Sequence, residues 1–200
     1  MSLTLVLYSL GAYYTYLHIY FPVLPPPPSY PVVDSPKNDI IFSKFKSSSP
    51  LSLAISATLA LIPPSDDPDP SSSESITRRR EQAQAFAHSA IDSIEMETEL
   101  LESSIEPSEA LSSFPIQAHR KNFHPGVRLE LESIAALLVL STYEYGQRGN
   151  IAKMRNRAGQ ALIAAMDMGL HSRIEENEYS EGDRRIWWMT VCPLDIFVLF

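Results

Sequence analysis

The chain has 200 residues and a mass of 22.4 kDa, which is enough for one domain with its own hydrophobic core. Hydrophobic residues make up 44% of it and charged residues 20%, which excludes a disordered, collagen-like or coiled-coil chain. The net charge of -8 argues against a broad basic surface for phosphate. The single cysteine, Cys192, excludes an internal disulfide and any zinc or iron-sulfur site built from several cysteines.

An apolar stretch opens the chain. Residues 3–24 contain no Asp, Glu, Lys or Arg, so a signal peptide or a membrane span has to be considered. Polar residues interrupt the stretch, and it ends in Phe21-Pro22 rather than in a cleavage site of small residues. We therefore expect a buried helix of a folded domain and no membrane partner, with a targeting or membrane-anchoring segment as the alternative.

Proline and serine mark the first breaks in the chain. Loops are predicted at residues 25–48 and 63–72, because proline fixes φ and lacks the amide donor that helices and strands require. Between them, Ser49 has the character of an N-cap, and Pro50 suits the first helical position. This pattern predicts a short buried helix over residues 51–62.

A long amphipathic helix is predicted after the second loop. Ser71 and Glu74 have the spacing of a capping box, and apolar residues then recur every three to four positions until the helix ends before Pro107. The basic triplet at residues 78–80 could suggest a phosphate or nuclear-import contact. Acidic neighbours such as Glu81 flank it, so a solvated helix face is the preferred interpretation.

Two further helices are predicted after Gly126 as a hairpin. Gly146 and Gly149 break the first helix, Asn150 caps the second, and Gly169 ends it. The small residues of the second helix would allow a close antiparallel approach of the two; they are Ala158, Gly159, Ala161, Ala164 and Ala165.

A last helix is predicted to open with a capping box at residues 180–183, and Pro193 should kink or stop it. No alternating strand pattern appears between the turn signals. The predicted fold class is therefore all-α, an irregular helical bundle with tetratricopeptide-like helical hairpins.

Residues that carry catalytic or metal chemistry form no recognisable motif. The five histidines lack metal-ligand spacing, and neither a nucleotide-binding glycine loop nor a hydrolase nucleophile motif occurs. Cys192 lies in an apolar run with no base nearby in sequence, which is typical of a small buried hydrophobe. We predict that the protein is not an enzyme and that this chain holds no cofactor.

Three sequence motifs carry a resemblance to a known family. The first is the run Tyr13 to Leu24, with His18, Phe21 and Pro22; the second is Ser49-Pro50-Leu51 and its helix. The third spans Leu129 to Asp195, where Gly169-Leu170-His171 closes one helix and Arg184-Arg185-Ile186-Trp187-Trp188 opens the next. Together they resemble the fungal-specific transcription factor domain of zinc-cluster regulators, also called the xylanolytic activator regulatory domain or middle homology region.

The resemblance implies a structural or regulatory role for a set of motif residues. They are His18, Phe21, Pro22, Gly149, Gly169, Leu170, His171, Arg184, Arg185, Trp187, Trp188 and Asp195. For the protein it implies a nuclear location and regulation of DNA-templated transcription. The family domain holds the activator inactive, responds to small-molecule inducers or co-regulator proteins, and contributes to dimer contacts, so these are the partners that the resemblance suggests.

The resemblance also has limits. The family's six-cysteine zinc cluster, which reads DNA, normally lies upstream, and residues 1–200 do not contain it; family sequence usually continues after Asp195. We therefore expect the N-terminal part of the regulatory domain, with DNA and zinc bound only through a missing upstream module. An internal piece, a truncated gene model and a member without that module all remain open.

The alternative functions are a tetratricopeptide-like protein-binding adaptor or a membrane-associated protein anchored by residues 3–24. No ligand or target gene is indicated.

Overall fold

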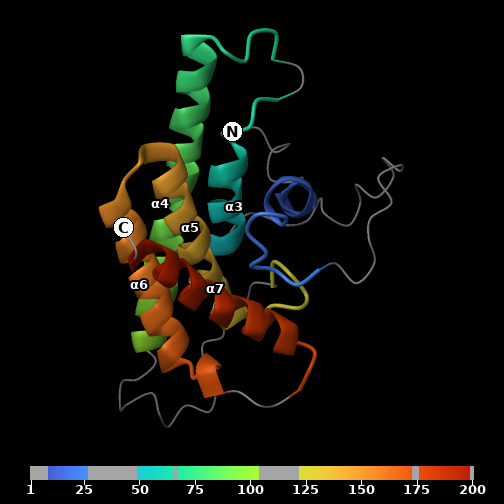
Figure 1. Cartoon of the computed structure of the whole chain (residues 1–200), viewed down its shortest axis with the longest axis vertical. Helices are drawn as coiled ribbons and strands as arrows, with labels where there is room; N and C mark the ends of the chain where they lie inside the picture. The colour runs from blue at the N-terminus through green and yellow to red at the C-terminus, as the bar shows by residue number, and fades with distance from the viewer. Residues whose placement is uncertain (1–8, 27–48, 65–66, 104–121, 173–175, 199–200) are drawn as a thin grey trace.

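The computed structural model describes residues 9–26, 49–64, 67–103, 122–172 and 176–198. In these ranges the regular structure is entirely helical, which confirms the predicted all-α class. Figure 1 shows the long helix α4 standing beside α3 and α5, with α6 on the outside and α7 crossing the bundle. The N-terminal segment lies on the far side of α3 from α4 (Figure 1).

The N-terminal apolar stretch is helical for only part of its length. A short helix, α1 (Ser9–Ala12), continues into a π-helical turn, η1 (Tyr13–Leu17). The amide of His18 closes this turn on the carbonyl of Tyr13 at 2.8 Å, a five-residue spacing typical of π-bulges. The chain then leaves the helix, and Val23 and Leu24 enter the core from a loop. The predicted continuous helix up to residue 24 is therefore too long.

Helix α3 (Pro50–Leu59) forms as predicted but ends before residue 62. Its cap is also confirmed, because the Ser49 hydroxyl accepts the amide of Ser52 at 3.2 Å. Proline at the first position costs no hydrogen bond there.

Helix α4 (Ser73–Ser103) ends before Pro107 as predicted. The predicted capping box of Ser71 and Glu74 is wrong: Ser72 caps the helix, since its hydroxyl accepts the amide of Ser75 at 3.2 Å. The preceding loop is present where residues 63–72 are described, whereas residues 27–48 of the other predicted loop lie outside the described ranges.

The predicted hairpin consists of α5 (Glu132–Arg148) and α6 (Ile151–Asp167), preceded by the short 3-10 turn η2 (Leu129–Leu131). Gly149 ends α5 with φ +60°, a conformation that favours glycine. Asn150 caps α6 by accepting the amide of Lys153 at 3.0 Å. These are the local signals that the sequence analysis used.

Two details of the hairpin were predicted wrongly. Gly146 lies inside α5 and does not break it. Gly159 has open space where a side chain would project, so it does not allow the close approach. Ala158, Ala161 and Ala165 are buried, and α5 packs more extensively on α6 than on any other described element. The alanines of this set, and not Gly159, therefore lie on the buried face of α6.

Helix α7 (Ser180–Val198) follows the 3-10 turn η3 (Leu170–Ser172) and contacts both α5 and α6. It continues past Pro193, so a stop at that residue was wrong. Its first turn packs closely on the backbone of Gly126: a side chain at Gly182 would collide with the Gly126 carbonyl oxygen. Among the described residues, no helix is long and apolar enough to cross a membrane.

Candidate functional site

Two of the family-like motifs, far apart in sequence, meet at the start of α7. The Arg185 guanidinium donates from Nη1 to the carbonyl oxygen of Pro22 at 3.4 Å and from Nε to the Glu181 carboxylate at 2.6 Å. Pro22 belongs to the opening motif and Arg185 to the motif of paired arginines and tryptophans. We call this region the α7 junction, defined by residues 13–25, 122–128 and 181–185.

The Tyr13 hydroxyl organises the N-terminal part of the junction. It donates to the carbonyl oxygen of Phe21 at 2.8 Å and accepts the amide of Leu24 at 3.1 Å. The Nδ1 atom of His18 lies 3.3 Å from the Tyr13 hydroxyl oxygen. Burial raises the pKa of Tyr13 to about 12, while burial and the nearby charge of Arg185 lower the pKa of His18. Both groups are therefore neutral near pH 7 and act by orienting the loop.

A second contact joins two parts of the third motif. The imidazole of His171 packs against the indole of Trp187, with ring centroids 5.8 Å apart. Leu170 is buried, and Gly169 ends α6 with φ +67°. These residues join the end of α6 to α7, so their role in the described structure is packing and turn formation.

The remaining motif residues lie toward solvent or outside the described side chains. Arg184 is exposed and pairs with Glu181 at 3.5 Å and Glu176 at 3.9 Å. Trp188 is 60% exposed. The backbone of Asp195 lies in α7, but its side chain is outside the described part of the structure.

Buried and half-buried polar residues that the sequence analysis did not identify complete the junction. His124 lies 3.0 Å from the Tyr14 hydroxyl through Nε2 and accepts the amide of Gly126 on Nδ1, also at 3.0 Å. Burial lowers the pKa of His124 to about 4. Arg128 forms an ion pair with Asp183 in the first turns of α7. No local sequence signal marks these pairs, since their members are distant in sequence.

Glu132 is a further unpredicted residue and is fully buried at the start of α5. Its carboxylate accepts the Ser49 hydroxyl at 2.6 Å and the amide of Phe123 at 2.5 Å. It therefore links the start of α3, the segment before η2 and α5. An acidic residue at the edge of an apolar run was the one signal that could have identified it.

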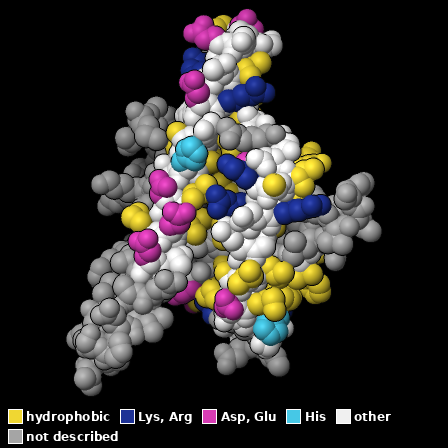
Figure 2. Space-filling view, turned by 90° about the vertical axis from the view of Figure 1, so that its left-hand side faces the viewer, with side chains coloured by type: hydrophobic (Ala, Val, Ile, Leu, Met, Phe, Trp, Pro, Cys, Tyr) yellow, Lys and Arg dark blue, Asp and Glu magenta, His cyan; other side chains and the backbone are white. Residues whose placement is uncertain are grey.

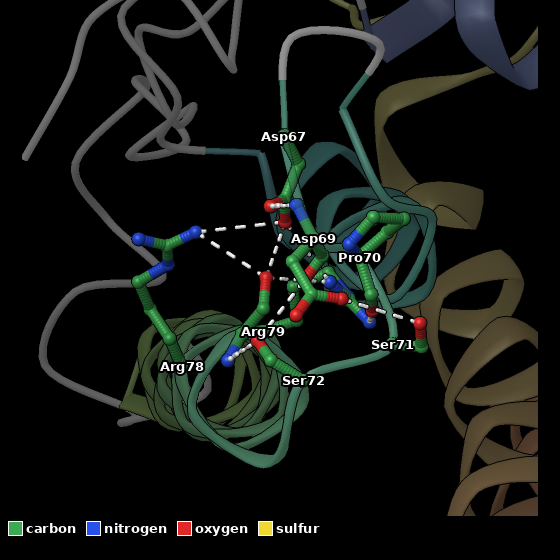
Figure 3. A network of polar contacts seen from close by, with 8 residues as sticks. Asp67, Asp69, Pro70, Ser71, Ser72, Arg78 and Arg79 are labelled. Carbon is green, nitrogen blue, oxygen red and sulfur yellow. Dashed lines mark hydrogen bonds and ion pairs between the residues drawn. The ribbon is translucent and has the colours of Figure 1, made fainter.

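The basic triplet at residues 78–80 is partly occupied by internal contacts (Figure 3). Arg79 Nη1 lies 3.3 Å from the Asp67 carboxylate, and Nη2 donates to the carbonyl oxygen of Pro70 at 2.7 Å. Ser75 donates to the same carboxylate, and this bond lowers the pKa of Asp67. The Arg79 side chain is only 12% exposed, compared with 67% for Arg78. The triplet is thus not a continuous solvated face, and Arg79 fixes the loop before α4.

Within the described ranges, no group of three or more His, Cys, Asp or Glu side chains could hold a metal ion. Cys192 is exposed on α7, contrary to the prediction of a buried hydrophobe. Comparison with known proteins finds no matching family model, no matching curated protein and no matching solved structure. Function must therefore be argued from the contacts of the chain itself.

Proposed function

We propose that the chain is the N-terminal part of the regulatory domain of a fungal zinc-cluster transcription factor and regulates transcription in the nucleus. One observation carries the proposal. The opening motif contacts the third motif across the fold, through Arg185 and Pro22, and His171 packs against Trp187 within the third motif. Motif residues that pack together in this way are what a shared domain core requires, whereas an accidental similarity would scatter them.

In this proposal the chain contributes regulation, and an upstream zinc cluster contributes DNA recognition. A net charge of -8 is unfavourable for contact with phosphate. The α7 junction would hold α7 in one orientation, because its contacts join α7 to the N-terminal segment and to residues 122–128. Loss of those contacts would change how α7 is presented and so would relieve the inhibition that the domain exerts.

A tethered reporter tests this function. The full chain is placed between a zinc-cluster DNA-binding module and an activating segment, and reporter output is compared with a fusion that carries a flexible spacer instead. We expect the chain to lower output at least ~5-fold, the low end of allosteric coupling free energies. DNA occupancy, measured by chromatin immunoprecipitation, should be equal for the two fusions.

Substitutions identify the junction as the source of the effect. Arg185→Gln removes the guanidinium that reaches Pro22, and we expect it to restore most of the output. Arg155→Gln on the exposed face of α6 is the matched control and should leave output low. Circular dichroism of each purified chain checks folding. Equal output from the chain and the spacer would contradict the regulatory function.

A further inference from the structure

A groove of about 400 Å³ opens between α4 and α6, above α5. None of the signature residues that carry the family resemblance lines it. Figure 2 shows this face of the molecule: Asp and Glu side chains lie along one side, Lys and Arg side chains along the other, and hydrophobic side chains between them. Its volume lies within the range of about 300–1,000 Å³ that is typical of small-molecule sites.

The floor of the groove is apolar and comes from three helices. Ile91 and Ile94 lie one turn apart on α4, Leu137 comes from α5, and Ala164 comes from α6. All four are buried or half-buried, and they border the hydrophobic core. A ligand lying on this floor would therefore bury apolar surface, the main favourable contribution in most small-molecule sites.

The walls carry opposite charges. Glu95 and Glu99 lie one helical turn apart on the α4 wall, and Arg157 lies on the α6 wall. Among the described residues, none of these three side chains has an ion-pair partner; Arg157 donates to the Gln160 side chain at 3.2 Å. Two carboxylates at this spacing repel each other, so a cation placed between them is favourable, and an anion is favourable at Arg157.

The length of the groove restricts the kind of ligand. Its α4 wall runs from Ile91 to Glu99, which corresponds to about 12 Å of helix. That length covers only about two turns of a docked helix, fewer than the three or four anchors of helix-in-groove recognition. We therefore consider a small molecule that reaches from the α4 wall to the α6 wall.

We propose that this groove binds a small amphipathic zwitterion. The protonated amine lies between Glu95 and Glu99, the carboxylate pairs with Arg157, and the apolar body rests on the floor. The proposal depends on the groove residues alone and not on the proposed role in transcription. A ligand could thus bind even if the reporter experiment fails, and the reporter could respond even if the groove is empty.

Titration with 8-aminooctanoate tests the proposal on the full chain. Chemical-shift changes in the methyl groups of Ile91, Leu137 and Ala164 should map the contact, with a Kd on the order of 1 mM for so small a ligand. Octylamine and octanoate, which each lack one charged end, should bind at least ~5-fold more weakly, since each loses a charge-assisted hydrogen bond.

Paired variants connect the binding to the walls. Arg157→Gln should weaken binding of 8-aminooctanoate at least ~5-fold and leave octylamine binding unchanged. The double variant Glu95→Gln with Glu99→Gln should also weaken 8-aminooctanoate at least ~5-fold, but it should leave octanoate binding unchanged. Glu81→Gln on α4 and Arg155→Gln on α6 are matched controls outside the groove. Because all are exposed or half-exposed polar positions, circular dichroism should show unchanged folding.

Three results would overturn the proposal. They are shift changes centred away from the groove, octylamine or octanoate binding as tightly as the zwitterion, and equal affinity in the wall variants and their controls. Confinement of the shifts to the groove, together with the charge-specific losses, would support it.

Discussion

The α5–α6 hairpin and the α7 junction are stabilised by different kinds of contact. In the hairpin, neighbouring helices bury alanines and apolar side chains against each other, and the connection between them is only Gly149 and Asn150. In the junction, buried polar groups join segments that are more than a hundred residues apart, as Tyr14 and His124 are. The stability of the hairpin depends on the local sequence pattern and on buried apolar area. The stability of the junction depends on each buried donor having a hydrogen-bond acceptor.

This difference predicts that the stability of the junction is sensitive to the loss of a single polar atom. A buried donor that loses its partner costs the desolvation of that group, about 1–3 kcal/mol. A hairpin of alanines and leucines loses stability in proportion to the volume removed. Substitutions that keep the shape of a side chain but change its polar atoms should therefore separate the two regions.

The largest effect is expected at Glu132, which links the two regions. Glu132→Ala leaves the Ser49 hydroxyl and the Phe123 amide buried without their acceptor and opens a cavity. We expect the free energy of unfolding to fall by about 3–4 kcal/mol, measured by urea denaturation. Glu132→Gln keeps an acceptor oxygen and should cost about half as much. A loss below about 1 kcal/mol for the alanine variant would mean that the buried carboxylate does not stabilise the fold.

The junction should also make stability depend on pH through His124. Its pKa is about 4 in the folded chain against a usual 6.5, so the unfolded chain binds the proton more tightly between these values. Stability is fully present above about pH 6.5 and falls as pH drops toward 4, by up to about 3 kcal/mol. Urea denaturation at a series of pH values measures this slope. His124→Gln, which cannot titrate, should flatten it; an unchanged slope in that variant would exclude His124 as its source.

The sequence predicted the hairpin well because its signals are local. Gly149 supplies positive φ, Asn150 supplies a cap, and the apolar stripe of α5 follows a helical period. Each of these acts within a few residues, so a single sequence contains the whole signal. Only finer predictions were wrong, such as the expectation that Gly146 breaks α5.

The junction could not be predicted by the same means. The contact between Pro22 and Arg185 joins residues 163 positions apart, and no periodicity relates them. Tyr14 and His124 are 110 positions apart, and their pairing exists only once the bundle has formed. The resemblance did identify Arg185 and Pro22 as noteworthy, but the contact between them comes from the structure. The groove was missed for the same reason, because its walls come from separate helices.

A smaller effect is expected where α7 meets the backbone of residue 126. At Gly182, an added methyl group would collide with the Gly126 carbonyl oxygen, and backbone cannot move aside as a flexible side chain can. Gly182→Ala should lower the free energy of unfolding by about 1–3 kcal/mol, the usual cost of overpacking. Thermal denaturation followed by circular dichroism measures it. A variant as stable as the parent chain would show that α7 can shift without cost.

The smallest effect, and the only gain in stability, is expected in the hairpin at Gly146. This residue is exposed inside α5, and an added methyl group meets no atom within 4 Å. Alanine has a higher helix propensity and less freedom in the unfolded chain, so Gly146→Ala should raise the free energy of unfolding by about 0.5–1 kcal/mol. Gly149→Ala is the matched control, because φ +60° is strained for alanine, and it should destabilise by about 1 kcal/mol. The same thermal denaturation measures both. Stability changes of opposite sign at two glycines three positions apart would show that backbone conformation governs stability here. A loss of stability on Gly146→Ala would instead indicate an additional contact on the exposed face of α5.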